Sequence, residues 1–188
     1  VDLVGKIAPG GYDFVNDDKD PDDDETSLTH GHGTASAGII VGNWNGVGVG
    51  GIAPSARVLP VKITDHKNET NGTLISQGVD YAAANASVKI ILLEAVGAST
   101  SAEELDSFAN AVAKGKLIIA PSGNAKQAGP FSPASSFALL GGAALIVGSH
   151  NGAGDLSSFS NGAKGVETSF ITAPGEQVVA AGNQSDNA

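Results

Sequence analysis

The stretch KIILLEAVGASTSAEELDSFANAVAKGKLIIA, residues 89–120, decides the fold. Its two ends, residues 89–93 and 116–120, are short apolar runs typical of fully buried strands without polar alternation. Between them, apolar side chains recur at helical spacing over residues 103–114, and Gly115 follows as a helix stop. A strand, a helix and a second strand in this order predict a parallel sheet.

The rest of the chain continues this alternation of strand-like and helix-like segments. We expect helices over residues 33–41 and 74–85, and strands over residues 57–63, 143–148 and 170–173. The predicted fold class is therefore α/β, a three-layer sandwich with a central, mainly parallel sheet and helices on both faces. No linker-like segment or internal repeat divides the sequence, so we expect a single domain over residues 1–188. Functional side chains should gather at the carboxyl ends of the strands.

Composition narrows the possible functions. The 188 residues are 41% hydrophobic, enough for one sizeable core. Twenty acidic against ten basic side chains give a net charge of −10, which disfavours nucleic-acid binding. No apolar run approaches the roughly 18 residues of a membrane span, and no signal peptide opens the chain. The absence of cysteine excludes disulfides, thiolate metal sites and a cysteine nucleophile, and the absence of methionine indicates that Val1 begins a processed or excised piece.

His32 is the first candidate for chemistry. It lies in HGHGTASAG, residues 30–38, where a histidine precedes a predicted helix of small residues. The positive end of a helix disfavours imidazolium and helps keep the ring neutral, as a general base requires, although a buried carboxylate partner would act in the opposite direction. The alternative is a turn histidine with a capping or surface role.

Asn124 is the second candidate. It ends KLIIAPSGN, residues 116–124, which places its carboxamide at the carboxyl end of a predicted strand. An amide donor held there can stabilise a developing oxyanion without carrying charge. The alternative is a turn asparagine that tolerates left-handed backbone geometry.

Several motifs together resemble those of the subtilisin-like serine proteases (subtilases, peptidase family S8), in the same order and at about the same spacing. They are HGTASAG (32–38), GNWNGVGVGGIAPSA (42–56), PSGN (121–124), SSFSNGAKG (157–165) and TAPGEQVV (172–179). By this resemblance His32 matches the triad histidine and Asn124 the oxyanion-hole asparagine. The resemblance also implies polypeptide substrates, a propeptide, and a secreted or cell-surface protein.

Two motifs of that family are missing from residues 1–188. The triad aspartate belongs to an Asp-Ser/Thr-Gly motif and the nucleophile to a Gly-Thr-Ser motif, and neither occurs here. We therefore expect the strand with the aspartate and the helix with the serine to lie outside this sequence, and the 188-residue chain alone to be inactive. The alternative is a catalytically inactive protease-like scaffold that acts as a peptide-binding or adhesin module.

The resemblance also marks substrate-binding residues. They are Glu94, Ala95, Val96, Gly97, Pro121, Ser122 and Gly123. Where the family has Asn-x-Ser-x-Gly, this chain has a glutamate, which predicts a preference for basic side chains before the scissile bond. A displaced or register-shifted strand is the alternative. Pro121 removes a backbone donor from the opposite wall.

The only cofactor expected is structural calcium, with none for catalysis. The resemblance points to Asp2, Asn43, Asn45, Val47 and Val49 as ligands, because Ca²⁺ takes carboxylate, amide and carbonyl oxygens. An ordinary glycine-rich surface loop is the alternative. The acidic stretch at residues 17–25 is interpreted as a solvated loop rather than a metal site. A transition-metal site at His30 and His32 is a weaker hypothesis, since no further histidine completes a defined set.

Overall fold

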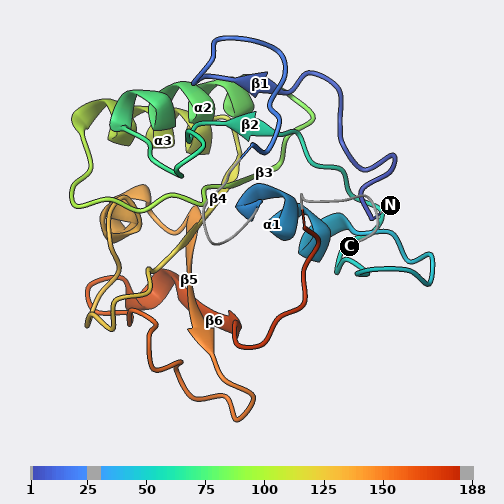
Figure 1. Ribbon diagram of the computed structural model, residues 1–188. Helices are drawn as coiled ribbons and strands as arrows, with labels where there is room; N and C mark the ends of the chain where they lie inside the picture. The colour runs from blue at the N-terminus through green and yellow to red at the C-terminus, as the bar shows by residue number, and fades with distance from the viewer. Residues whose placement is uncertain (1, 25–30, 183–188) are drawn as a thin grey trace. The chain divides into compact units, whose positions relative to one another are not determined.

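The computed structural model describes residues 2–24 and 31–182 and divides into two compact units, each with its own sheet (Figure 1). The first unit consists of the chain up to Leu74 together with the segment from Val179 onward. The second unit runs from Ile75 to Val178. A single domain over residues 1–188 remains our prediction.

The second unit is built on a four-stranded parallel sheet. Its strands are β3 (Ile90–Leu92), β4 (Leu117–Pro121), β5 (Ala144–His150) and β6 (Phe170–Pro174), adjacent in that order. Helix α2 (Gly72–Ala84) precedes β3 along the chain, and the short 3-10 helix η2 (Glu167–Ser169) precedes β6. The predicted α/β class with a parallel sheet is confirmed, and the carboxyl ends of all four strands share one edge.

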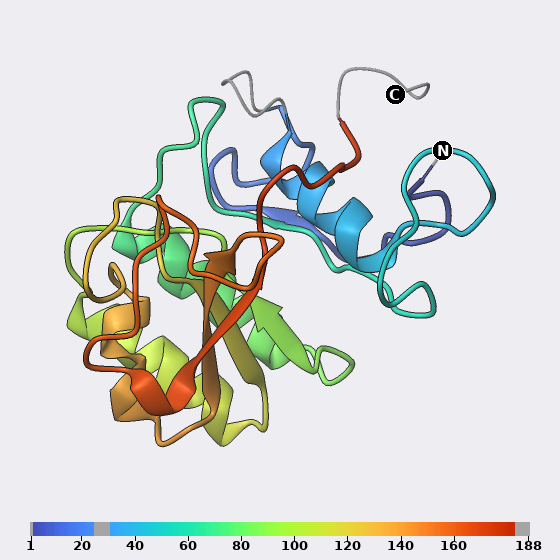
Figure 2. The ribbon, with the colours of Figure 1, turned by 90° about the horizontal axis from the view of Figure 1, so that it is seen from below.

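Helix α3 (Ala102–Ala113) packs against β4 and against the 3-10 helix η1 (Ala134–Leu140), which packs on β5 (Figure 2). The rings of Phe108 and Phe137 meet edge to face at this contact, with centroids 5.1 Å apart. Both rings are fully buried. This aromatic pair is the centre of the core between the helices and the sheet.

The ends of α3 follow from local sequence. Ser101 Oγ accepts a hydrogen bond from the Glu104 backbone N–H, and the Glu104 carboxylate accepts one from the Ser101 N–H at 2.7 Å. This capping box satisfies two amide groups that the first turn leaves unpaired. At the other end, Gly115 has φ +75°, a conformation that glycine adopts without strain. The predicted helix and its stop are therefore confirmed.

The first unit holds helix α1 (His32–Val41) and a two-stranded parallel pair, β1 (Tyr12–Asp13) and β2 (Val61–Lys62). The helix is made of small and apolar residues and buries Ala37 and Val41. Small side chains allow close approach of neighbouring backbone: a Cβ on Gly42 would lie 2.6 Å from the Val49 carbonyl oxygen. The predicted small-residue helix is thus confirmed.

Two strand predictions need correction. The apolar run at residues 57–63 forms a regular strand only at β2, because Pro60 has no N–H to donate. The run at residues 89–93 was expected to be fully buried, but Ile90 and Leu92 are 56% and 41% exposed. Successive side chains of a strand point to opposite faces, and among the described residues only one face of β3 is well covered.

Candidate functional site

His32 is the first residue of α1, directly after Gly31, whose φ is +99°. The first turn is fixed by Asp23, whose Oδ2 accepts hydrogen bonds from the Thr34 backbone N–H at 2.7 Å and from Thr34 Oγ1 at 2.6 Å. Asp23 therefore acts as a helix cap supplied by a segment outside the helix. The half-buried His32 thus starts from a fixed backbone position at the positive end of the helix.

Asn124 follows β4, as predicted, and is exposed. Within residues 2–24 and 31–182, its carboxamide has no hydrogen-bond partner. The preceding Gly123 is buried and has φ +103°, and a Cβ there would lie 2.6 Å from the Phe131 ring and 2.7 Å from Asn161 Nδ2. Only glycine fits this position, and the next residue is thereby presented at the surface with a free amide donor.

The residue that the sequence analysis missed is Asn161. It is fully buried, and its side chain makes three hydrogen bonds to the loop that carries Asn124. The motif SSFSNGAKG contains Asn161 but gave no reason to separate it from the surrounding serines and glycines. Only the folded chain brings residues 161 and 124 into one local structure.

The predicted substrate-binding residues lie at the carboxyl ends of two adjacent strands. The chain stays beside β4 just beyond β3, because the Leu93 N–H donates to the Ile119 carbonyl at 2.8 Å. Farther on, the Gly97 N–H donates to the Ser132 carbonyl at 2.7 Å. Glu94 is half-buried and Val96 is exposed, whereas Ala95 is buried. Their role in binding substrate stays a prediction.

Pro121, Ser122 and Gly123 form the end of β4 and the start of the following loop. Ser122 is buried, and its hydroxyl donates to the Asn161 carbonyl at 3.1 Å. Its side chain is therefore used inside the protein. The Ser122 N–H continues the sheet by donating to the Val147 carbonyl at 2.9 Å.

Three of the predicted calcium ligands, Asp2, Asn43 and Val49, are joined by hydrogen bonds in the first unit. Asp2 is 5% exposed, and its Oδ1 is a buried oxygen with no hydrogen-bond partner among the described residues. Its Oδ2 accepts from the Val49 N–H at 3.2 Å, and its carbonyl accepts from the Asn43 N–H at 2.9 Å. A Cβ on Gly48 would overlap the Asp2 carboxylate, so glycine is required where the loop passes it.

Further oxygens of this loop are available to a cation. The Asn43 amide donates through Nδ2 to the Val4 carbonyl at 3.0 Å, which leaves its Oδ1 without a partner in the described chain. The carbonyl oxygens of Asn45, Val47 and Val49 likewise accept no hydrogen bond from described residues. One carboxylate with several neutral oxygens is a donor set that suits Ca²⁺.

Two residues of the acidic stretch at 17–25, Asp23 and Asp24, make contacts within the protein. Asp23 caps α1, and Asp24 lies 2.6 Å from Lys62 Nζ, which also lies 3.2 Å from the fully buried Asp13. Burial raises the pKa of Asp13, but hydrogen bonds from Asn16, Val15 and Lys62 outweigh it and hold the pKa below the ordinary value.

No group of three His, Cys, Asp or Glu side chains comes together in the part of the chain that the structure describes. This part does not include Glu25 or His30, two residues weighed for metal binding, nor Val1. His32 and Asn124 belong to different units, so their assignment to one active site stays a prediction.

Residues 2–188 match the family model described as the subtilase family, and the chain belongs to this family. The chain is 33% identical to the major intracellular serine protease of Bacillus subtilis (strain 168), an alignment that covers 95% of this chain and 54% of that protein. It is 36% identical to thermitase of Thermoactinomyces vulgaris, with 71% and 46% covered. Subtilisin Savinase of Lederbergia lenta is 32% identical, with 90% and 58% covered. The chain thus spans about half the length of these relatives.

Solved structures agree with this assignment. A cold-adapted subtilisin-like serine proteinase superposes with a TM-score of 0.76 at 26% identity, covering 95% of this chain and 59% of that one. A mutant of the protease domain of PatA gives a TM-score of 0.80 at 24% identity, covering 98% and 66%, and shows the shared fold. None of the described helices is long and apolar enough to cross a membrane.

Proposed function

We propose that this chain is part of a serine endopeptidase that hydrolyses peptide bonds in proteins through a Ser-His-Asp triad and an asparagine oxyanion hole. His32 is the triad histidine and Asn124 the oxyanion donor. The aspartate and the serine come from residues outside 1–188. Membership of the subtilase family supports the reaction class. The exposed Asn124 carboxamide, unpartnered among the described residues at the carboxyl end of β4, is the observation that carries the assignment of roles.

His32 acts as general base and then as general acid. Its ring takes the proton from the serine hydroxyl as the serine oxygen attacks the substrate carbonyl carbon, and later passes it to the leaving amine. The position of His32 at the first residue of α1 supports this role, since the positive end of the helix disfavours the protonated ring before the reaction. The Asp23 cap supports it further by fixing the turn that begins at the histidine.

Asn124 stabilises the negative charge that develops on the carbonyl oxygen in the tetrahedral intermediate. A neutral amide can donate from Nδ2 without attracting a counter-ion in the absence of substrate. Since no described residue accepts a hydrogen bond from this carboxamide, the substrate does not have to displace an internal partner.

The test replaces each residue by alanine in the protein expressed from its complete reading frame. His32→Ala should abolish turnover of a peptide amide, and Asn124→Ala should lower kcat while KM changes little. Loss of one such donor in subtilisin costs roughly 10²–10³ in kcat, and we take that known scale as the expectation. Asn110→Ala, at a half-buried position of α3 where the amide donates to Asp80 Oδ1 at 2.8 Å, is the control and should keep full activity. An Asn124→Ala protein with unchanged kcat would contradict the assignment, and an inactive parent would favour a non-catalytic peptide-binding scaffold.

We also propose that Glu94 directs the enzyme toward basic side chains before the scissile bond. Its place just beyond β3, where the chain still runs beside β4, supports this. Glu94→Gln should lower kcat/KM for Lys and Arg substrates by roughly tenfold, the value of about 1.4 kcal/mol of lost charge pairing, with little change for Leu and Phe substrates. Glu103→Gln, the same chemical change at an exposed position of α3, serves as the control. A parent that prefers apolar side chains would contradict this proposal.

We propose that the loop at residues 43–49 binds structural calcium together with Asp2. The buried Asp2 Oδ1, which has no hydrogen-bond partner in residues 2–24 and 31–182, supports this. When bound, the ion would neutralise that carboxylate and cross-link the loop to the start of the chain.

We propose further that the protein is secreted or lies at the cell surface, and comparing culture supernatant and cell-surface fraction with cell lysate tests this. The similar proteins of Bacillus subtilis include both a minor extracellular protease and a major intracellular serine protease.

A further inference from the structure

We infer that Asn161 is a positioning residue, which holds the loop at residues 122–127 in the conformation that presents Asn124. This inference rests on the proposed function of Asn124 as the oxyanion donor. Asn161 does not touch the reacting atoms. It acts through Asn124.

The Asn161 carboxamide bonds to the loop on both sides of Asn124. Its Nδ2 donates to the Ser122 carbonyl at 2.9 Å, before Asn124. Its Oδ1 accepts from the Ala125 N–H at 3.0 Å and from the Gln127 N–H at 2.9 Å, after Asn124. One side chain thus joins the segment that enters the turn to the segment that leaves it.

The backbone of Asn161 contributes in the same direction. Its N–H donates to the Gly123 carbonyl at 2.8 Å, and its carbonyl accepts from the Ser122 hydroxyl at 3.1 Å. Asn124 therefore lies between two residues that Asn161 holds directly, Gly123 through its carbonyl and Ala125 through its N–H. The position of the Asn124 backbone is restricted, and mainly the torsions of its own side chain remain free.

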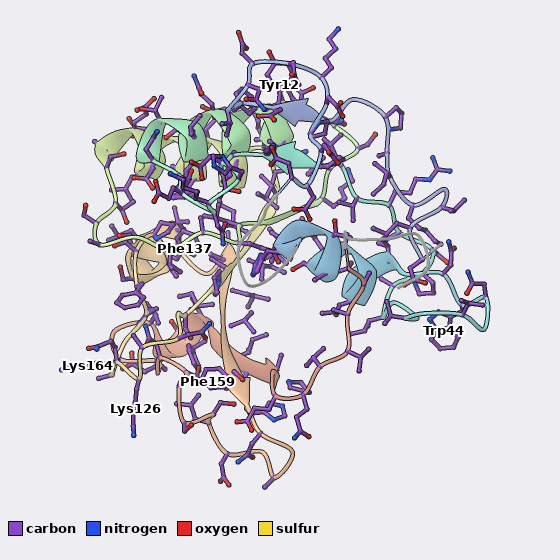
Figure 3. All side chains as sticks on the ribbon, in the orientation of Figure 1. Tyr12, Trp44, Lys126, Phe137, Phe159 and Lys164 are labelled. Atoms are coloured by element: carbon purple, nitrogen blue, oxygen red, sulfur yellow. The ribbon has the colours of Figure 1, made fainter. Side chains whose placement is uncertain are left out.

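A ladder of backbone hydrogen bonds extends this contact. Lys126 N–H donates to the Phe159 carbonyl at 2.8 Å, and Lys164 N–H donates to the Ala128 carbonyl at 2.9 Å. Figure 3 labels Lys126, Phe159 and Lys164, which lie in the same region of the second unit. The two segments therefore run side by side, and Asn161 is near the middle of the contact.

Close backbone approach makes this contact specific. A Cβ on Gly162 would lie 2.8 Å from the Ala128 carbonyl oxygen, and one on Gly129 would lie 2.6 Å from the Lys164 carbonyl oxygen. Since neither position has room for a side chain, the glycines let the segments approach closely enough for a short asparagine side chain to span the turn.

Asparagine is suited to this place by its chemistry. An amide offers a donor and an acceptor with two lone pairs, and Asn161 uses one N–H and two acceptor directions on the loop. A buried aspartate lacks the donor for the Ser122 carbonyl, and a leucine of similar size pairs none of these groups. Ala125 and Gln127 are exposed, so water can satisfy their N–H groups after a substitution, but water does not fix the loop.

The predicted consequence is kinetic. An oxyanion donor contributes most when it is already in place before charge develops, because no reorganisation is then needed. A misplacement of about 1 Å can cost roughly 10²-fold in rate. Asn161→Ala should therefore lower kcat by roughly that factor. Because Asn161 also bonds to Ser122 and Gly123, two predicted substrate-binding residues, the diagnostic quantity is kcat rather than KM.

The experiment is a double-mutant cycle in the protein from the complete reading frame. Asn124→Ala, which is costly in the wild type, should cost less than roughly threefold in the Asn161→Ala background, because the donor it removes is already misplaced. Asn151→Ala is the matched control. Asn151 Oδ1 also accepts two backbone N–H groups, from Ala153 at 2.9 Å and Asp155 at 3.0 Å, in a different loop. Its effect should add independently to that of Asn124→Ala.

Amide hydrogen exchange provides a readout that needs neither activity nor a stable variant. In the wild type, the exposed Ala125 and Gln127 amides should exchange at least roughly tenfold more slowly than unprotected amides, and Asn161→Ala should remove this protection. Wild-type exchange at the unprotected rate overturns the inference, even if Asn161→Ala does not fold. Additive effects in the cycle also overturn it. A wild-type protein without peptidase activity refutes the proposed function instead, and the exchange result then decides whether Asn161 holds the loop.

Discussion

Buried polar side chains in this protein hold backbone groups that the regular elements leave unpaired. Asn161 holds both sides of the Asn124 loop. The buried Lys116 donates from Nζ to the carbonyls of Asn85 and Val88, at 2.8 and 2.7 Å, in the segment that leads into β3. Loss of one such hydrogen bond typically destabilises a protein by about 0.5–1.5 kcal/mol.

Asp13 yields a prediction about pH at this scale. Its pKa in the folded protein is below the ordinary value, because hydrogen bonds from Asn16, Val15 and Lys62 outweigh the effect of burial. A lowered folded-state pKa adds stability above the unfolded-state pKa of about 3.9, and this stability is lost as the pH falls through the folded-state pKa. Asp13→Asn should therefore destabilise the protein at pH 7 and weaken the acid dependence of unfolding.

Urea unfolding of the complete protein at several pH values between about 7 and 3 checks this prediction. Asp155→Asn, on an exposed loop, is the control and should leave the pH dependence as it is in the wild type. Parallel pH curves for wild type and Asp13→Asn would show that the buried carboxylate is not the source of the acid sensitivity.

At the scale of elements, local signals place the helices and strands well but not their surroundings. Gly115 ends α3 as expected, and the Ser101–Glu104 capping box, which the structure adds, begins it. The cap of α1, in contrast, comes from Asp23, a residue whose acidic surroundings predict only a solvated loop. The apolar run at residues 89–93 predicts a strand but not which of its faces is covered, since covering depends on other elements.

The loop at residues 43–49 carries the prediction for this scale. If it binds Ca²⁺ together with Asp2, the thermal midpoint should rise in millimolar calcium and fall in EGTA, since a ligand that binds only the folded state stabilises it by mass action. At a calcium concentration of about 100 times Kd the gain is about 2.7 kcal/mol, a shift of roughly 5–11 °C at 2–4 °C per kcal/mol for a domain of about this size.

Asp2→Asn should remove most of this calcium dependence, and Asp106→Asn, the same chemical change on the exposed face of α3, should keep it. Differential scanning calorimetry on the complete protein measures both. A midpoint that neither calcium nor EGTA moves means that the loop holds no ion, and the buried Asp2 Oδ1 would then need another partner.

The whole molecule consists of two compact units, with His32 in the first and Asn124 in the second. Subtilase membership covers residues 2–188, whereas the chain spans about half the length of its relatives. We therefore predict that the 188-residue chain alone does not hydrolyse casein, because a serine protease without its nucleophile forms no acyl intermediate.

The comparison is between the purified 188-residue chain and the protein from the complete reading frame at equal concentration, with circular dichroism to verify that both are folded. Activity in the complete protein only is the expected result. Casein cleavage by the shorter chain, surviving a change of His32 to alanine, would indicate a contaminant. Cleavage lost in His32→Ala would place a complete active site within these residues.

Periodicity was enough to predict the α/β class and the parallel direction of the central strands. The resemblance of the motifs was enough to predict the family and the candidates His32 and Asn124. Periodicity and short motifs involve residues that are close together in the sequence, so they can be recognised without the folded structure. Asn161, the Asp23 cap and the orphaned Asp2 oxygen became visible only in the folded protein. Each depends on atoms from segments distant in sequence that folding brings within hydrogen-bond distance, and residue type alone does not specify such partners.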